Sequence, residues 1–222
     1  MRSDPSLAVS DTIVVMIPAL VTRRGVGFRL GDLFPERHGF NVMVGSGRPL
    51  SRGHILLRNA DPATHPLIFP EYFVEPEDLH ALARSVQRMR DMMRRPAISA
   101  VIERELAPGP IANEQASIEA DIRARAATFF HPSGTCRMGA EPAAVVDPQL
   151  RVNGIEGLRV VDASIMPAAL NACTHAPTIM NGEKGAELIA GGRLKRYKVA
   201  RTLLQLKAHP MVQKPFGLKG RL

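Results

Sequence analysis

Cysteine is scarce in this chain, and long apolar runs are missing. The 222 residues include two cysteines, too few for a disulfide framework, so we expect a reducing, cytoplasmic setting. The longest apolar run, residues 13–21, is about half a membrane span and contains Pro18, which argues against a transmembrane helix. Asp4 and Asp11 interrupt the N-terminal residues, so we expect no signal peptide either.

Acidic residues are missing from the last part of the chain. The final one is Glu187, and residues 191–222 contain nine Lys or Arg and no Asp or Glu. Residues 1–190 hold 20 basic and 21 acidic residues, so the net charge of +8 comes from the tail. Nucleic-acid binding needs a basic face with interleaved aromatic residues, which residues 1–190 lack. We therefore expect a folded body of residues 1–190, a basic tail of residues 191–222, and no nucleic-acid partner.

The basic tail has two interpretations. Its composition is typical of a solvated, disordered segment. Alternatively, Leu194, Tyr197 and Leu204, with Lys and Arg between them, form a basic amphipathic helix on an anionic membrane surface. The second interpretation would place a cytoplasmic protein at the membrane periphery.

Short strands with polar connections are expected in the first third of the chain. Thr12–Ile17 is β-branched and apolar, residues 39–44 alternate apolar and polar side chains, and residues 54–58 form a third short run. The sequence Gly-Ser-Gly ends the second run, and Asn-Ala-Asp-Pro at residues 59–62 predicts a turn. The glycine-bearing residues 23–32 predict a loop. This pattern favours a largely antiparallel sheet.

Two helices are expected after the strands. The first begins near Glu75 and Pro76, with acidic residues in its first turn, and ends before Pro96. Its apolar residues recur at spacings of three or four and are Leu79, Leu82, Val86, Met89 and Met93. The second helix spans residues 113–127, with Ile118 and Ile122 facing inward. The fold class is therefore α+β, a mainly antiparallel sheet with helices packed on one side.

The most distinctive stretch is residues 131–188, which contains two histidines 44 positions apart. His131 opens the block HPSGTCRMG, and His175 lies in NACTHAPTIM. Between them, VVDPQLRVNGIEGLRVVDASIMP contains two β-branched pairs with turn residues around both. We expect strands and tight turns that hold the two imidazoles toward one point, since functional side chains are often placed by a rigid scaffold. Outside such a motif, a lone histidine after two phenylalanines is better interpreted as a hydrogen-bonded core residue.

These three blocks, in this order, resemble the C-terminal signature of the glucose-methanol-choline (GMC) flavoprotein oxidoreductases, closest to the choline and alcohol dehydrogenase branch. The likeness extends upstream to RPLSRGHILLRNADP at residues 48–62 and FPEYFVEPEDL at residues 69–79. The resemblance implies FAD-dependent oxidation of a primary, choline-like alcohol, with hydride transfer to the flavin.

The resemblance also implies roles for the two histidines. His131 matches the family's catalytic base, and a neutral imidazole suits proton removal because the unperturbed pKa of histidine is about 6.5. His175 matches the family's second active-site position. This implies a hydrogen bond to the substrate oxygen that stabilises developing alkoxide charge.

Four further positions match family segments that contact the cofactor. Asp162 and Ala163 match the segment beside the ribityl and pyrophosphate region, and Thr174 precedes the second active-site position. Pro177 begins the last helix, whose N-terminal amides would face the flavin ring edge. The residue types alone leave a second interpretation of Asp162, as a turn or cap residue.

The sequence departs from the family pattern in three respects. The family's dinucleotide-binding GxGxxG fingerprint occurs nowhere, so we expect that the chain lacks the N-terminal FAD-binding half. Alone it would bind FAD weakly or not at all, and its partner would be a separate FAD-binding half. Cys173 stands where the family usually has Asn. Asn181, Gly182 and Gly185 replace aliphatic helix residues, and a helix-interior glycine costs about 0.5–1 kcal/mol relative to alanine. The chain is then a truncated product, one piece of a split enzyme, or a degenerate remnant.

Two other interpretations compete with the enzyme. His131, Cys136, Cys173 and His175 offer the ligand types of a His2Cys2 zinc site. However, Cys173 and His175 leave one residue between them where structural pairs usually leave two to four, so we expect no metal. The second alternative is a structural module that keeps the fold but cannot hold FAD.

Overall fold

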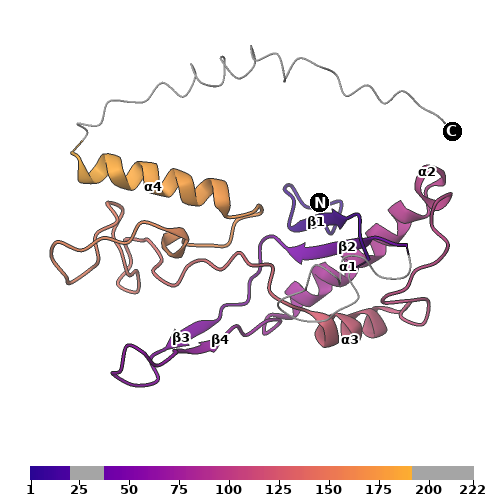
Figure 1. Cartoon of the computed structure of the whole chain (residues 1–222), viewed down its shortest axis with the longest axis horizontal. Coiled ribbons are helices and arrows are strands. Elements are labelled where there is room, and N and C mark those ends of the chain that lie inside the picture. Colours follow the sequence, from indigo (N-terminus) through magenta and orange to yellow (C-terminus); the bar gives the residue numbers. More distant parts are fainter. Residues whose placement is uncertain (21–37, 192–222) are drawn as a thin grey trace, which may run out of the picture. The chain divides into compact units, whose positions relative to one another are not determined.

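A computed structural model describes residues 1–20 and 38–191 of the chain. It forms two units, Met1–Gly182 and Glu183–Leu222, which divide within the last helix. The elements in order are β1 (Thr12–Ile17), β2 (Asn41–Ser46), β3 (His54–Leu56), β4 (Leu67–Phe69), α1 (Pro76–Met93), α2 (Pro96–Ser99), α3 (Gln115–Arg125), a 3-10 turn (Ala163–Ile165) and α4 (His175–Ile189) (Figure 1). The loop expected at residues 23–32 and the tail after Gly191 lie outside the described residues.

The strands β1 and β2 pair antiparallel, from Thr12 opposite Ser46 to Ile17 opposite Asn41. The prediction of β1 is confirmed. The prediction for β2 was two residues too early, because Gly45 continues the strand instead of ending it. A Cβ at Gly45 would lie 3.0 Å from the Phe129 ring. The glycine therefore marks a close approach of another segment to the strand, the second common meaning of glycine in a strand pattern.

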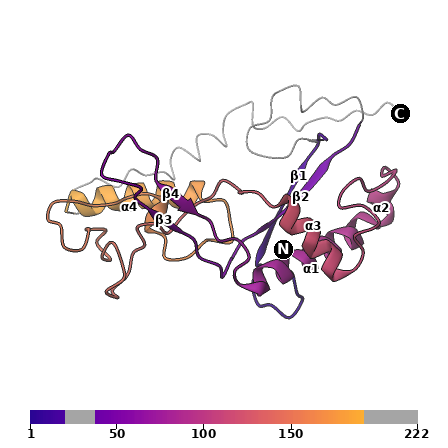
Figure 2. The same ribbon diagram turned by 90° about the horizontal axis from the view of Figure 1, so that it is seen from below.

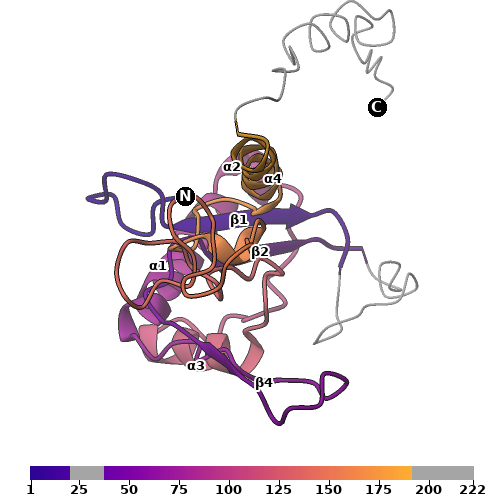
Figure 3. The ribbon, with the colours of Figure 1, turned by 90° about the vertical axis from the view of Figure 1, so that its left-hand side faces the viewer.

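The helix α1 forms the centre of the first unit. Pro76 occupies its first turn with Glu77 and Asp78, as expected, and Leu79 and Met89 are buried. It packs against β1 and β2 and against α3, which lies beside it in both Figure 2 and Figure 3. The shared core contains Ala83, Ala112 and Ile118, with Val86 and Ile122 packed against it. Burial of one such aliphatic side chain contributes about 1.5–3 kcal/mol, so these few contacts join the helices.

The strands β3 and β4 form a second antiparallel sheet that is separate from the first. The chain is therefore α+β with two small antiparallel sheets, where we expected a largely continuous one. β4 was not foreseen, because Leu67–Phe69 is only three residues long and carries no alternation.

Residues 131–174 consist mostly of turns. The expected strands at the two valine pairs reduce to isolated bridges, which join Val146 to Met138 and Val152, and Arg151 to Arg159. Val146 is fully buried and Leu150 is nearly so. This segment is therefore stabilised by turns and by the burial of these aliphatic side chains, and not by a continuous β-ladder.

No helix within residues 1–20 and 38–191 is long and apolar enough to cross a membrane.

Candidate active site

His131 follows two phenylalanines that have different tasks. Phe129 packs on Gly45 of β2, and its ring centroid lies 5.9 Å from that of His131. Phe130 has a φ of 59° and turns the chain, leaving its own side chain 65% exposed. A bulky residue with positive φ is uncommon and carries strain. The strand pair thus sets the position of the imidazole through the Phe129 ring.

The partner of His131 is Thr174, 43 residues later. The Thr174 hydroxyl lies 3.0 Å from Nδ1 of His131, and the Thr174 backbone N–H donates to the same nitrogen at 3.4 Å. The hydroxyl contact falls within the usual hydrogen-bond range, and the backbone contact is longer. The hydroxyl can donate to Nδ1, as the backbone N–H does, or accept from Nδ1–H. In the second tautomer the backbone N–H no longer donates to Nδ1, and the lone pair lies on Nε2. Nε2 has no partner among the residues that the structure describes.

A cavity of about 1860 Å³ lies beside this pair. His131, Pro132 and Thr174 form part of its wall, and residues of β1, β2 and α1 form much of the rest. Pockets for small ligands usually measure about 300–1,000 Å³. The cavity is therefore larger than a pocket for one small substrate usually is.

His175 does not line this cavity. It is the first residue of α4 and is exposed. The contact that the structure shows at this point joins His131 to Thr174, the residue immediately before His175. Sequence reasoning placed Thr174 against the cofactor and missed this contact. A threonine just before a helix was the available signal, but it also has the simpler meaning of a cap.

The Asp162 segment forms a turn, as its second interpretation predicted. Asp162 Oδ1 accepts from the Ser164 backbone nitrogen at 2.8 Å and from the Ser164 hydroxyl, so the residue caps the 3-10 turn. Its other carboxylate oxygen, Oδ2, has no partner among the described residues, and the side chain is exposed. Asn181 of α4 donates from Nδ2 to the Asp162 carbonyl at 3.1 Å. The unusual Asn181 thus joins the two segments expected to contact the cofactor.

The N-terminus of α4 presents first-turn amides that have no partner among the described residues. Its first internal bond runs from the Thr178 nitrogen to the Thr174 carbonyl at 2.9 Å, and the Thr178 hydroxyl donates to the same oxygen. The first-turn amides of a helix have no intrahelical acceptor, and they carry the positive end of the helix dipole. Together with the free Asp162 oxygen and the half-buried Ala163, they fit the hydroxyl and carbonyl groups of a flavin cofactor along one side.

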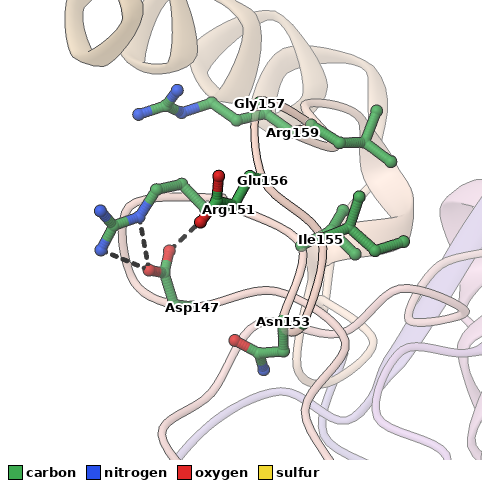
Figure 4. A pocket seen from close by; sticks show the side chains of 10 residues that line it. Asp147, Arg151, Asn153, Ile155, Glu156, Gly157 and Arg159 are labelled. Carbon is green, nitrogen blue, oxygen red and sulfur yellow. Dashed lines mark hydrogen bonds and ion pairs between the residues drawn. The ribbon is translucent and has the colours of Figure 1, made fainter.

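A smaller pocket of about 530 Å³ lies within residues 147–159 (Figure 4). The Asp147 carboxylate accepts from the Arg151 backbone at 2.9 Å, the Arg151 Nε at 2.8 Å and the Gln149 backbone at 2.8 Å. These contacts, chiefly the Arg151 backbone N–H, hold the pKa of Asp147 below its ordinary value of 3.8. They stabilise the loop itself.

Metal-binding groups do not gather in the described part of the chain, where no three His, Cys, Asp or Glu side chains could hold one ion. Cys136 is half-buried, Cys173 is exposed, and both are free thiols.

Comparison with known proteins identifies the family of this chain. Residues 49–182 match a family model described as GMC oxidoreductase. An alcohol dehydrogenase [acceptor] from Pseudomonas putida is 42% identical over 175 residues, 75% of this chain and 32% of that protein. An oxygen-dependent choline dehydrogenase from Burkholderia lata is 47% identical over 156 residues, 70% of this chain and 28% of that protein. The chain spans about a third of the length of these relatives.

Solved structures give the same result. Pyridoxine 4-oxidase from Mesorbium loti aligns with a TM-score of 0.73 at 31% identity, over 84% of this chain and 36% of that one. An FAD-dependent oxidoreductase from Chaetomium thermophilum aligns with a TM-score of 0.66 at 27% identity, over 71% of this chain and 28% of that one.

Proposed function

Because this chain belongs to the GMC oxidoreductase family, we propose that it is the substrate-side portion of an FAD-dependent alcohol dehydrogenase or oxidase. The observation that carries the proposal is His131, held by Thr174 in the wall of a cavity larger than a pocket for one small substrate usually is. Relatives named alcohol dehydrogenase and choline dehydrogenase support a primary, choline-like alcohol as the substrate class.

In this proposal His131 removes the alcohol proton. The proposal requires the tautomer with the proton on Nδ1, in which Nδ1–H donates to the Thr174 hydroxyl at 3.0 Å and the Nε2 lone pair is free to accept a proton. The Phe129 ring and the strand pair beneath it hold the imidazole, so little reorientation is needed when substrate binds.

His175 has the complementary role of hydrogen-bond donor to the alcohol oxygen. It lies at the N-terminus of α4, where free amides and the positive dipole end favour negative charge. A donor there stabilises charge that develops on oxygen as the proton leaves.

The residues that would hold FAD are Asp162, Ala163, Thr174 and the first turn of α4 at Pro177. When bound, the flavin supplies the acceptor for the hydride. Asp162 Oδ2 would accept a hydrogen bond from a cofactor hydroxyl, and the first-turn amides of α4 would donate to cofactor carbonyl oxygens. This set covers one side of a cofactor only, and the sequence lacks GxGxxG. We therefore propose that a separate FAD-binding portion completes the site and that the chain alone binds FAD weakly or not at all.

We further propose a cytoplasmic location, with the basic tail contacting anionic membrane surfaces at the periphery. Its nine basic residues, without acidic ones, supply the attraction. Binding of the full chain to vesicles containing phosphatidylserine, lost when residues 192–222 are removed, tests this directly.

The test of function is complementation. The full chain is co-expressed with the flavin-binding portion of the Pseudomonas putida alcohol dehydrogenase, and loss of flavin absorbance is followed anaerobically after adding alcohols, choline among them. We expect alcohol-dependent bleaching that His131→Ala slows by roughly 10²–10⁴-fold. A co-purified, flavin-loaded complex that no alcohol reduces would favour the alternative of a non-catalytic remnant of the fold.

A further inference from the structure

The hairpin of β3 and β4 is apolar on both of its faces. Cross-strand partners share a face, so Ile55 and Ile68 lie on one side and Leu56 and Leu67 on the other. Ile55 is 47%, Leu56 50% and Ile68 64% exposed. Strands that read as continuous apolar runs are typically covered on both faces. Here neither face is covered by the described residues.

The hairpin also has no structural support from other elements. In the part of the chain that the structure describes, β3 and β4 contact each other and no other strand or helix (Figure 1). The stacked rings of His54 and Phe69, 4.7 Å apart, strengthen the pair from within. A lone two-stranded hairpin is at best marginally stable in water. The exposed apolar side chains and the lack of contacts with other elements predict that another polypeptide segment packs on the hairpin.

The base of the hairpin is nevertheless firmly fixed. The buried Asp78 carboxylate of α1 accepts from the backbone nitrogens of Leu50 and Ser51, both at 2.7 Å. A Cβ at Gly53 would lie 2.2 Å from the Phe69 carbonyl oxygen, so the entry to β3 requires glycine. On the exit side, Glu71 has a φ of 49°, a conformation that non-glycine residues rarely adopt. The close approach at Gly53, the positive φ of Glu71 and the Asp78 contacts thus fix the position of a hairpin whose apolar side chains are exposed.

We propose that the β3–β4 hairpin is the surface on which the FAD-binding portion of a GMC oxidoreductase docks. The hairpin lies inside the family match at residues 49–182, and relatives that contain this match have about three times the aligned length. Their additional chain is the partner that we assign to this hairpin. The proposal rests on the proposed function, because it assumes such a partner, and it adds which residues bind it.

The experiment measures co-purification in place of activity. The tagged full chain is co-expressed with the flavin-binding portion of the Pseudomonas putida alcohol dehydrogenase, and the captured partner and its flavin are quantified. Leu56→Glu and Ile68→Glu, one on each face, should each reduce capture at least tenfold. The matched control is Ile111→Glu, at a position that is 92% exposed and outside the hairpin. It should change capture less than twofold.

Each outcome decides the matter. If the wild-type chain captures no partner, the proposed function fails and this inference fails with it. If the wild type captures the partner and the hairpin variants capture it equally, only this inference is overturned. If the chain alone forms dimers that Ile68→Glu dissociates, the hairpin binds a second copy and the inference is also overturned. Should a strand variant melt early, Leu57→Glu serves in its place, because Leu57 is 86% exposed. Full capture by that variant would likewise refute the inference.

Discussion

Replacing Asp78 by alanine should detach residues 50–51 from α1 and destabilise the chain substantially. The carboxylate accepts two backbone N–H bonds at 2.7 Å from its buried position in the first turn of the helix. A hydrogen bond to a charged group contributes about 1.5–3 kcal/mol. Water can reach Leu50, which is exposed, and recovers part of the loss. We therefore expect a decrease of about 2–4 kcal/mol in the free energy of unfolding.

Urea denaturation of the full chain measures this change, and Glu77→Ala provides the matched control. Glu77 is also an acidic residue in the first turn of α1, but it is exposed and pairs with Arg84 and His80 at the surface. Such pairs contribute about 0–1 kcal/mol. The stability loss of Asp78→Asn should lie between those of the two alanine variants, because the asparagine side chain has one acceptor oxygen where the carboxylate has two. Equal stability losses for Asp78→Ala and Glu77→Ala would refute the reasoning.

Four further results are expected. In the complemented enzyme, His131→Ala should slow flavin reduction by roughly 10²–10⁴-fold. Flavin reduction should be slower in His175→Ala than in His175→Asn, because asparagine keeps a hydrogen-bond donor. Stopped-flow absorbance measures both rates. In the same assay, Thr174→Val should slow reduction by about tenfold, with Thr174→Ser near wild type. Purified alone, the chain should be colourless, and stoichiometric flavin absorbance after dialysis would contradict this. Asp147→Asn should lower stability at pH values above 3.8, because the pKa of Asp147 is depressed in the folded state. In urea melts this difference should disappear as pH falls below that value.

The sequence predicted the strands and helices whose signal lies within a few consecutive residues. The β-branched run at Thr12–Ile17 and the helical periodicity of α1 each carry their signal within a few residues, and both predictions are confirmed. The second helix was expected at residues 113–127 and is α3, with Ile118 fully buried. The membership of the GMC family, suggested by three short blocks, is also confirmed.

The remaining features depend on contacts between distant residues. Gly45 was expected to break a strand, because nothing near it in sequence indicates that the Phe129 ring occupies the missing side-chain volume. The hydrogen bond between His131 and Thr174 joins residues 43 positions apart. A threonine before a helix has several uses, and only the fold selects one of them. The roles of the two histidines stay predictions.

The contact between Phe129 and Gly45 makes the strand register a determinant of where the imidazole sits. Side chains alternate along a strand, so slipping β2 by one residue would place Val44 or Ser46 beneath the Phe129 ring and push it outward. The His131 ring, 5.9 Å from that of Phe129, would move with it. The register of β1 and β2 therefore limits the position of the His131 side chain, more than 80 residues later in the sequence. Substitutions in β1 that loosen this alignment should alter the proposed reaction without changing any residue to which a role in it is assigned.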